Sequence, residues 1–236
     1  MARYIRRHNF WARFVHWVYA VLGIFLLITG LAIFVPGLGE VLGVGFLRAS
    51  STAHAFAGIA FVVLPIIGYM AKPSNLKHIV QNLFRRWDKD DVDFMKFFPL
   101  YLFNPKKYNM PKQHYIKSGQ RASDIVMYML ILVFMCSGVL MLLGTNLLPV
   151  WIFAAARLAH VLAMMLFSIL LVVHIFLGAG IFQPYRRLPR GMFGDGLVSE
   201  SDALYHWGHW AEEELASGKN VVEKPSKVEV AKAAAK

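Results

Sequence analysis

The sequence predicts an all-α integral membrane protein, a four-helix bundle with a cytoplasmic loop and tail. Of its 236 residues, 57% are hydrophobic and 17% are charged, whereas soluble domains average about 25% charged residues. The hydrophobic residues gather in four runs, each long enough to cross about 30 Å of hydrocarbon as a helix. These runs cover residues 14–35, 52–71, 123–143 and 151–182. The fourth run exceeds one span, so we expect its helix to tilt or to project from the bilayer.

The first run follows several arginines near the N-terminus, as the apolar part of a signal peptide would. Its apolar stretch is longer than the usual signal-peptide core, and no A-x-A-like cleavage site follows it. We therefore interpret it as a retained helix. Cleavage would remove His16 and the haem hypothesis that depends on it.

The basic residues predict the orientation in the membrane. The loop between the first two runs has only Arg48, balanced by Glu40, and the turn at 144–150 has no charge. The positive-inside rule then places both termini in the cytoplasm of a multi-pass inner (plasma) membrane protein. The net charge of +11 is explained by contact with anionic lipid, without a nucleic-acid partner. The basic segments contain Arg3, Arg6, Arg7 and Arg13, then Lys72, Lys77, Arg85, Arg86, Lys89, Lys96, Lys106, Lys107, Lys112, Lys117 and Arg121, and finally Arg186, Arg187 and Arg190.

The chain is expected to divide into a four-helix membrane domain at residues 1–190 and a cytoplasmic tail at 191–236. Within the tail, residues 212–215 can form a short helix. Residues 219–236 are rich in Lys, Ala and Val and lack a pattern that would bury a face. This composition predicts a disordered end.

Four of the nine histidines lie in the apolar runs, where an ionisable side chain is costly and indicates a functional site. The predicted helix directions place His54 and His160 near the outer surface, and His16 and His174 near the inner one. His160 and His174 are fourteen residues apart, which leaves them within ~40° around the helix and ~21 Å along it. Each can therefore meet a partner histidine across a haem iron, at two depths. Bis-imidazole ligation suits electron transfer because it leaves no open iron position.

Two other interpretations of these histidines stay open. They can be hydrogen-bonded braces between helices, or ligands in a zinc or copper pathway. A metal pathway would want carboxylates or thiols at the same depth, and the runs offer only Asp124 and Cys136. A single cysteine also excludes an intrachain disulfide and an iron–sulfur cluster, and the sequence has no CxxCH haem-attachment motif.

Several further residues are candidates for the same sites. Arg157 lies one turn before His160, where it can bind a haem propionate or extend toward the interface as an ordinary membrane-edge arginine. The stretch Lys117-Ser118-Gly119-Gln120 precedes the third run on the cytoplasmic side. We expect it to be a non-helical turn that either lines a quinone pocket or simply enters the membrane. Space for a haem between helices is expected at glycines that follow histidines, or these glycines serve close helix packing. They are Gly23, Gly30 and Gly58.

The chain resembles the gamma subunit of membrane-bound respiratory formate dehydrogenase, a four-helix dihaem cytochrome b, from Arg6 to about Glu214. The pattern R-x-x-x-W-x-x-R-F-x-H-W and the His-x13-His pair carry the resemblance, together with the Gly119-Gln120 segment and a polar tail. In this sequence they are Arg7, Trp11, Arg13, Phe14, His16, Trp17, His54, Gly119, Gln120, His160, His174, Gly196–Glu200, His206, His209, Trp210 and Glu212. Lys117 stands where the family commonly has asparagine, which changes the expected quinone contact.

The resemblance implies two haem b groups, an outer one on His54 and His160 and an inner one on His16 and His174. It implies an iron–sulfur beta subunit on the outer face and a molybdenum or tungsten alpha subunit that oxidises formate. Electrons would pass to menaquinone or ubiquinone near the cytoplasmic face, where Lys117, Gly119 and Gln120 would lie. The whole complex can form a higher-order oligomer, and this chain alone has no complete catalytic site for formate.

Two alternatives to this function remain at the level of the sequence. The same haems would serve the cytochrome subunit of a hydrogenase or a thiosulfate reductase, because the His-x13-His spacing occurs in those proteins too. A haem-free membrane anchor or a metal transporter is the alternative from another class of protein. The subunits that copurify with the chain would distinguish a formate dehydrogenase from a hydrogenase or thiosulfate reductase. The colour of the purified protein would distinguish a cytochrome from a haem-free anchor or transporter.

Overall fold

The computed structural model describes residues 1–35, 37–104, 107–108, 110–181 and 185–225. The chain forms two compact units. We call Trp11–Leu76 together with Val126–His174 the membrane unit, and Met1–Phe10, Lys77–Ile125 and Ile175–Lys236 the polar unit. Each unit is made of segments that are separate in the sequence. These units therefore do not test the predicted division between residues 190 and 191, which stays a prediction.

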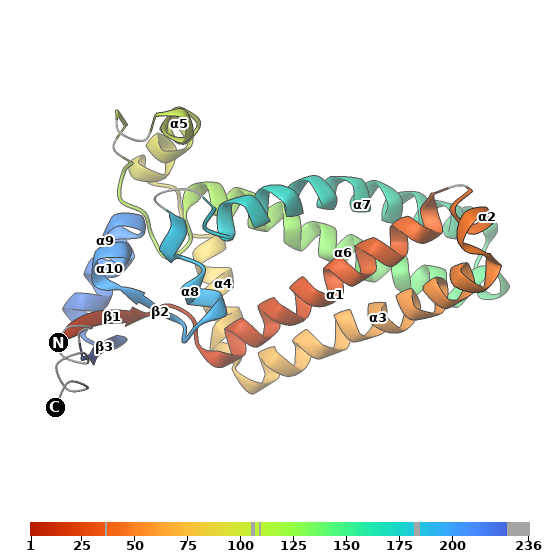
Figure 1. Cartoon of the computed structure of the whole chain (residues 1–236), viewed down its shortest axis with the longest axis horizontal. Coiled ribbons are helices and arrows are strands. Elements are labelled where there is room, and N and C mark those ends of the chain that lie inside the picture. The colour runs from red at the N-terminus through yellow and green to blue at the C-terminus, as the bar shows by residue number, and fades with distance from the viewer. Residues whose placement is uncertain (36, 105–106, 109, 182–184, 226–236) are drawn as a thin grey trace. The chain divides into compact units, whose positions relative to one another are not determined.

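The membrane unit is built from helices that lie side by side (Figure 1). In the described part of the chain, four helices are long and apolar enough to cross a membrane: α1 (Phe10–Phe34), α3 (Val44–Ala71), α6 (Ser118–Leu147, apolar as far as Gly144) and α7 (Val150–Gly178). Large apolar side chains such as Val21, Ile28 and Ile169 are exposed on these helices, as expected where lipid is the solvent. The predicted all-α membrane bundle is confirmed.

Some helix ends differ from the predicted spans. Helix α3 begins at Val44 and α6 at Ser118, so both start before their apolar runs at residues 52 and 123. Hydropathy marks only the stretch that lies in hydrocarbon, whereas the helix continues through polar residues such as Arg48. Helix α7 ends at Gly178, and residue 182, the predicted end of the fourth run, lies outside the described residues. A short helix, α2 (Leu38–Leu42), precedes α3.

Close packing between α1 and α3 holds the membrane unit together near its first histidine. A Cβ atom added to Gly68 would lie 2.4 Å from Val15 Cγ2 and 3.2 Å from Phe14 Cδ1. The rings of Tyr19 and Phe61 meet with centroids 4.8 Å apart. Helices with small residues at the contact can approach this closely, so Gly68 sets the spacing of the two helices.

The polar unit contains a three-stranded antiparallel sheet in the order β2-β1-β3. Its strands are β1 (Ala2–Arg6), β2 (Leu197–Ser199) and β3 (Val221–Lys224), with Ile5 opposite Val198 and Tyr4 opposite Val222. The predicted disorder is therefore wrong for residues 221–224, because backbone pairing with the distant N-terminus orders a segment that has no burying pattern of its own. Residues 226–236 lie outside the described residues.

The polar unit contains helices as well as the sheet. They are α4 (Pro73–Leu83, which begins in the membrane unit), α5 (Lys89–Phe103), α8 (Arg190–Phe193), α9 (Glu200–His206) and α10 (Gly208–Ser217), with a 3-10 turn, η1 (Tyr185–Arg187). Helices α8, α9 and α10 contact the sheet. The predicted short helix at 212–215 is confirmed within α10. The core cluster consists of Ile5, Val198, Ala203, Trp207, Trp210 and Ala211.

Candidate functional site

The four membrane histidines form two facing pairs in the membrane unit. His54 of α3 faces His160 of α7, and His16 of α1 faces His174 of α7. In both pairs the ring centroids are 6.2 Å apart, with interplanar angles of 65° and 35° respectively. The structure thus brings together the same partners that the predicted helix directions paired.

The ring spacing fits a metal ion held between two imidazoles. A nitrogen–metal bond of about 2 Å on each side, with about 1 Å from each nitrogen to its ring centre, gives centroids about 6 Å apart. An imidazole pair in direct hydrogen bonding would place its donor and acceptor nitrogens about 3 Å apart and the ring centres closer together. The ring spacing in both pairs therefore fits two axial imidazole ligands of a haem iron.

The second nitrogen of each histidine in the His54–His160 pair is hydrogen-bonded to a buried hydroxyl. Thr29 Oγ1 of α1 lies 2.9 Å from His54 Nδ1, and Ser137 Oγ of α6 lies 2.8 Å from His160 Nδ1. Both hydroxyl residues are buried. Sequence reasoning missed Thr29 and Ser137, although each is a hydroxyl residue followed by glycine in an apolar run, which was the available signal.

Three glycines are predicted to leave space for a haem, and two of them lie against side chains of the bundle. A Cβ atom at Gly30 would lie 3.2 Å from His54 Cε1, and one at Gly23 would lie 3.8 Å from Phe61 Cε2. A Cβ atom at Gly58 would meet nothing within 4 Å. Gly30 therefore leaves room for a site histidine, and the open space beside Gly58 keeps its predicted clearance for a haem a prediction.

Arg157 is exposed on α7, one turn from His160. None of the ion pairs among the residues that the structure describes includes Arg157. Its guanidinium is therefore available to an added carboxylate, and its predicted contact with a haem propionate stays a prediction.

Lys117 lies in the polar unit and is buried, with its Nζ 3.1 Å from His206 Nδ1. Its ammonium also lies over the rings of Tyr185 and Trp207, at 4.6 and 5.0 Å from their centroids. Burial, reinforced by the positive charge of Arg7, lowers the pKa of Lys117 to about 7. This lysine can therefore gain and lose a proton near neutral pH.

The expected non-helical turn at Lys117–Gln120 is wrong, since α6 begins at Ser118. Ser118 Oγ donates to Asp91 Oδ1 at 2.7 Å, and its backbone N–H donates to Gln113 Oε1 at 2.9 Å. These side chains provide acceptors for the free N–H and hydroxyl groups at the helix start, which is why the helix begins so early. Gly119 is half-buried, with the Phe94 ring near its free side, and Gln120 is exposed and donates to Asp124.

A small cavity in the polar unit adjoins Lys117. Its volume is about 20 Å³, and its lining includes Tyr101, Tyr185, Tyr205 and His206. The hydroxyls of Tyr101 and Tyr205 form a hydrogen bond of 2.9 Å. A space of this size admits about one water, so a quinone ring does not fit it as it stands.

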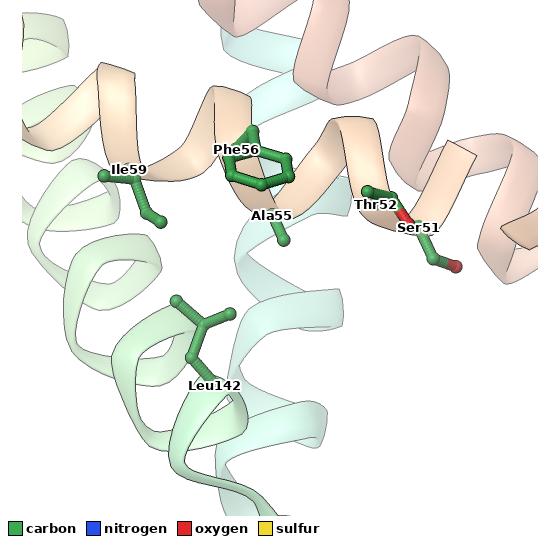
Figure 2. Close-up of a pocket in the computed structure, with 6 residues that line it drawn as sticks. All are labelled: Ser51, Thr52, Ala55, Phe56, Ile59 and Leu142. Carbon is green, nitrogen blue, oxygen red and sulfur yellow. The ribbon is translucent and has the colours of Figure 1, made fainter. Parts of the chain in front are cut away.

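The membrane unit has a larger apolar cavity of about 460 Å³ between α3 and α6. Figure 2 shows Leu142 extending from α6 toward the α3 residues Phe56 and Ile59. Its polar lining groups are the hydroxyls of Ser51 and Thr52. No titratable side chain lines it, so it offers an apolar molecule a surface and no acid–base chemistry.

A bundle of membrane-crossing helices with facing histidine pairs defines a membrane-embedded electron-transfer protein of the cytochrome b class. The family model of the prokaryotic cytochrome b561 matches residues 7–195, and the chain belongs to this family. The protein is therefore a multi-pass membrane protein that binds haem b and transfers electrons. A comparison with curated proteins gives no match.

Proposed function

We propose that this chain is the dihaem cytochrome subunit of a membrane-bound formate dehydrogenase complex. In this proposal His54 and His160 ligate one haem b, and His16 and His174 ligate the other. An iron–sulfur subunit on the outer face supplies electrons from formate oxidation at a molybdenum or tungsten subunit. Quinone near the cytoplasmic face receives them. The resemblance described above supports the partner subunits and the quinone.

The observation that carries the two haem sites is the recurrence of the same ring separation in both histidine pairs. Two unrelated pairs of bracing histidines have no reason to share a centroid distance of 6.2 Å. A haem b bound between two of these imidazoles would supply one-electron chemistry. The chain's own contribution is to hold each imidazole pair at the spacing of two axial bonds.

Apolar side chains pack along α7 between the positions of His160 and His174. Leu130, Ala163 and Phe167 form a buried cluster, and Phe134 packs its ring edge against both His160 and Phe167. Along α7 the two ligand histidines are fourteen residues apart, or ~21 Å. Helix α7 therefore carries one proposed ligand of each haem, with apolar residues between them.

For the remaining contacts we propose Arg157 as a propionate partner and Lys117, Gly119 and Gln120 as quinone contacts. The pKa of the buried Lys117 amine is lowered to about 7. This supports a role for Lys117 in proton uptake at the quinone site. The basic loops support the proposed orientation, with both termini in the cytoplasm. A cysteine introduced next to the N-terminus and labelled only after the membrane is opened would support that orientation, and labelling from outside would reverse it.

The test of the haem sites is a pyridine haemochrome count per chain, with a reduced-minus-oxidised spectrum, on the purified full chain. We expect two b haems in the wild type and one in His160→Ala and in His16→Ala, each keeping a different haem. The matched control is His78→Ala, which removes an exposed histidine of α4 outside the pairs and should keep both haems. Two haems in either paired-histidine variant would refute the ligand assignment.

The test of the formate partner uses membranes in which the tagged chain is expressed with its natural neighbours. We expect formate to reduce the haem spectrum and the tagged chain to copurify with a molybdenum or tungsten subunit. Reduction by hydrogen but not by formate would replace this partner with a hydrogenase, while leaving the haem assignment intact.

A further inference from the structure

We propose that Thr29 and Ser137 are positioning residues for the haem ligands His54 and His160. Each hydroxyl oxygen accepts a hydrogen bond from the Nδ1–H of its histidine. This fixes the tautomer in which Nε2 carries the lone pair that binds iron. The inference rests on the proposed haem sites and assigns a function to two residues outside the ligand set.

The direction of these hydrogen bonds follows from the other contacts of the hydroxyls. A hydroxyl has one proton to donate and two lone pairs that accept. Thr29 Oγ1 donates to the Phe25 carbonyl at 2.9 Å, and Ser137 Oγ donates to the Val133 carbonyl at 2.5 Å. Since each proton is used within its own helix, the hydroxyl is left as an acceptor toward Nδ1, and Nδ1 must be the donor.

The same arrangement occurs twice in the membrane unit, on different helices. Thr29 is followed by Gly30 in α1, and Ser137 by Gly138 in α6. A Cβ atom at Gly30 would lie 3.2 Å from His54 Cε1, and one at Gly138 would lie 4.0 Å from His160 Cε1. In each case the hydroxyl binds Nδ1 and the following glycine faces the adjacent ring carbon, closely at Gly30 and at ordinary van der Waals distance at Gly138. This recurrence indicates a ligand support and argues against chance packing of a polar side chain.

The other histidine pair gives an internal contrast. His16 Nδ1 is buried and has no hydrogen-bond partner among the residues that the structure describes. An acceptor at Nδ1–H makes an imidazole a stronger electron donor to its metal, which favours the ferric state. Loss of Thr29 or Ser137 as an acceptor should therefore raise the midpoint potential of the His54–His160 haem and leave the other haem unchanged.

The experiment is a redox titration of the purified, haem-loaded full chain, in which the two haems are resolved by their optical spectra and by electron paramagnetic resonance. Thr29→Val keeps the size and branching of the side chain but removes the acceptor, and Ser137→Ala removes the other one. Thr29→Ser restores a hydroxyl at the same position and is the matched control. We expect an upward shift of one midpoint in Thr29→Val and in Ser137→Ala, with wild-type behaviour in Thr29→Ser.

Two outcomes would overturn the inference. The first is a pair of unchanged midpoints in Thr29→Val and Ser137→Ala while both haems stay bound. The second is loss of the same haem in Thr29→Ser and in Thr29→Val. Thr29→Ser keeps the hydroxyl, so this loss would mean that Thr29 acts by packing and not by its hydrogen bond. Selective loss of that haem in Thr29→Val with retention in Thr29→Ser would support it. A wild-type chain without haem would refute the proposed function as well, so the two failures are distinguishable.

Discussion

Replacement of Gly68 by alanine should displace α1 from α3 beside a proposed haem ligand. Gly68 is buried in α3, and the added Cβ would lie 2.4 Å from Val15 Cγ2. Carbon atoms pack best at about 3.5–4.0 Å, so the two helices must separate by about 1 Å or more. Val15 cannot easily turn away, because a valine in a helix has one strongly preferred rotamer.

The expected cost follows from the size of the overlap. An extra methyl group forced into a well-packed core typically costs about 1–3 kcal/mol. Val15 precedes His16 on α1, so the strain is relieved by moving His16 away from His174. With about 1.4 kcal/mol for each factor of ten, the haem on this pair should be held about 5- to 100-fold more weakly.

The assay is the haem content per chain after dilution into haem-free apomyoglobin, which captures released haem. Gly68→Ala should release one haem early and keep the other, whereas the wild type keeps both. The matched control is Gly45→Ala on the same helix, where the added Cβ meets nothing within 4 Å. It should behave as the wild type, because alanine is also the better helix former.

Equal haem release from Gly68→Ala and Gly45→Ala would refute this reasoning. It would mean that the α1–α3 contact does not control the position of His16. Early loss of the His54–His160 haem instead would show that the strain is transmitted away from the contact, and would equally contradict the expectation.

Two further predictions concern the polar unit. Asp91→Ala should destabilise it by about 3–5 kcal/mol, because Asp91 and its partner Arg121 are both 1% exposed and lie 3.1 Å apart. The control Asp93→Ala removes a pair between a half-buried carboxylate and the exposed Lys96 and should cost less than about 1 kcal/mol. Trypsin cleavage rates in detergent measure the stability of both variants, and equal rates would contradict the expected difference between them. Lys117→Met should stabilise the protein most at and below pH 7. Because the pKa of Lys117 falls from 10.5 to about 7 on folding, the unfolded chain binds more protons between these values, so wild-type stability rises there with pH. Thermal unfolding from pH 6 to 10 tests this, and a pH-independent difference would contradict it.

The sequence by itself determined the membrane spans and the four histidines at membrane depth. Hydropathy over about 20 residues is a local property that survives any tertiary arrangement. The helix directions then left few ways to pair the histidines, and the 3.6-residue period placed His160 and His174 on nearly the same side of α7. Fold class and candidate ligands therefore followed from local composition and spacing.

Only the tertiary structure decided which groups surround those ligands and how the polar segments fold. Thr29 meets His54 across 25 residues, and Lys117 meets His206 across 89. Contacts of this kind depend on the rotation and separation of helices, which a single sequence does not specify. For the same reason the pairing of β1 with β3 was missed, because a strand of four residues is ordered by its partner and not by its own pattern.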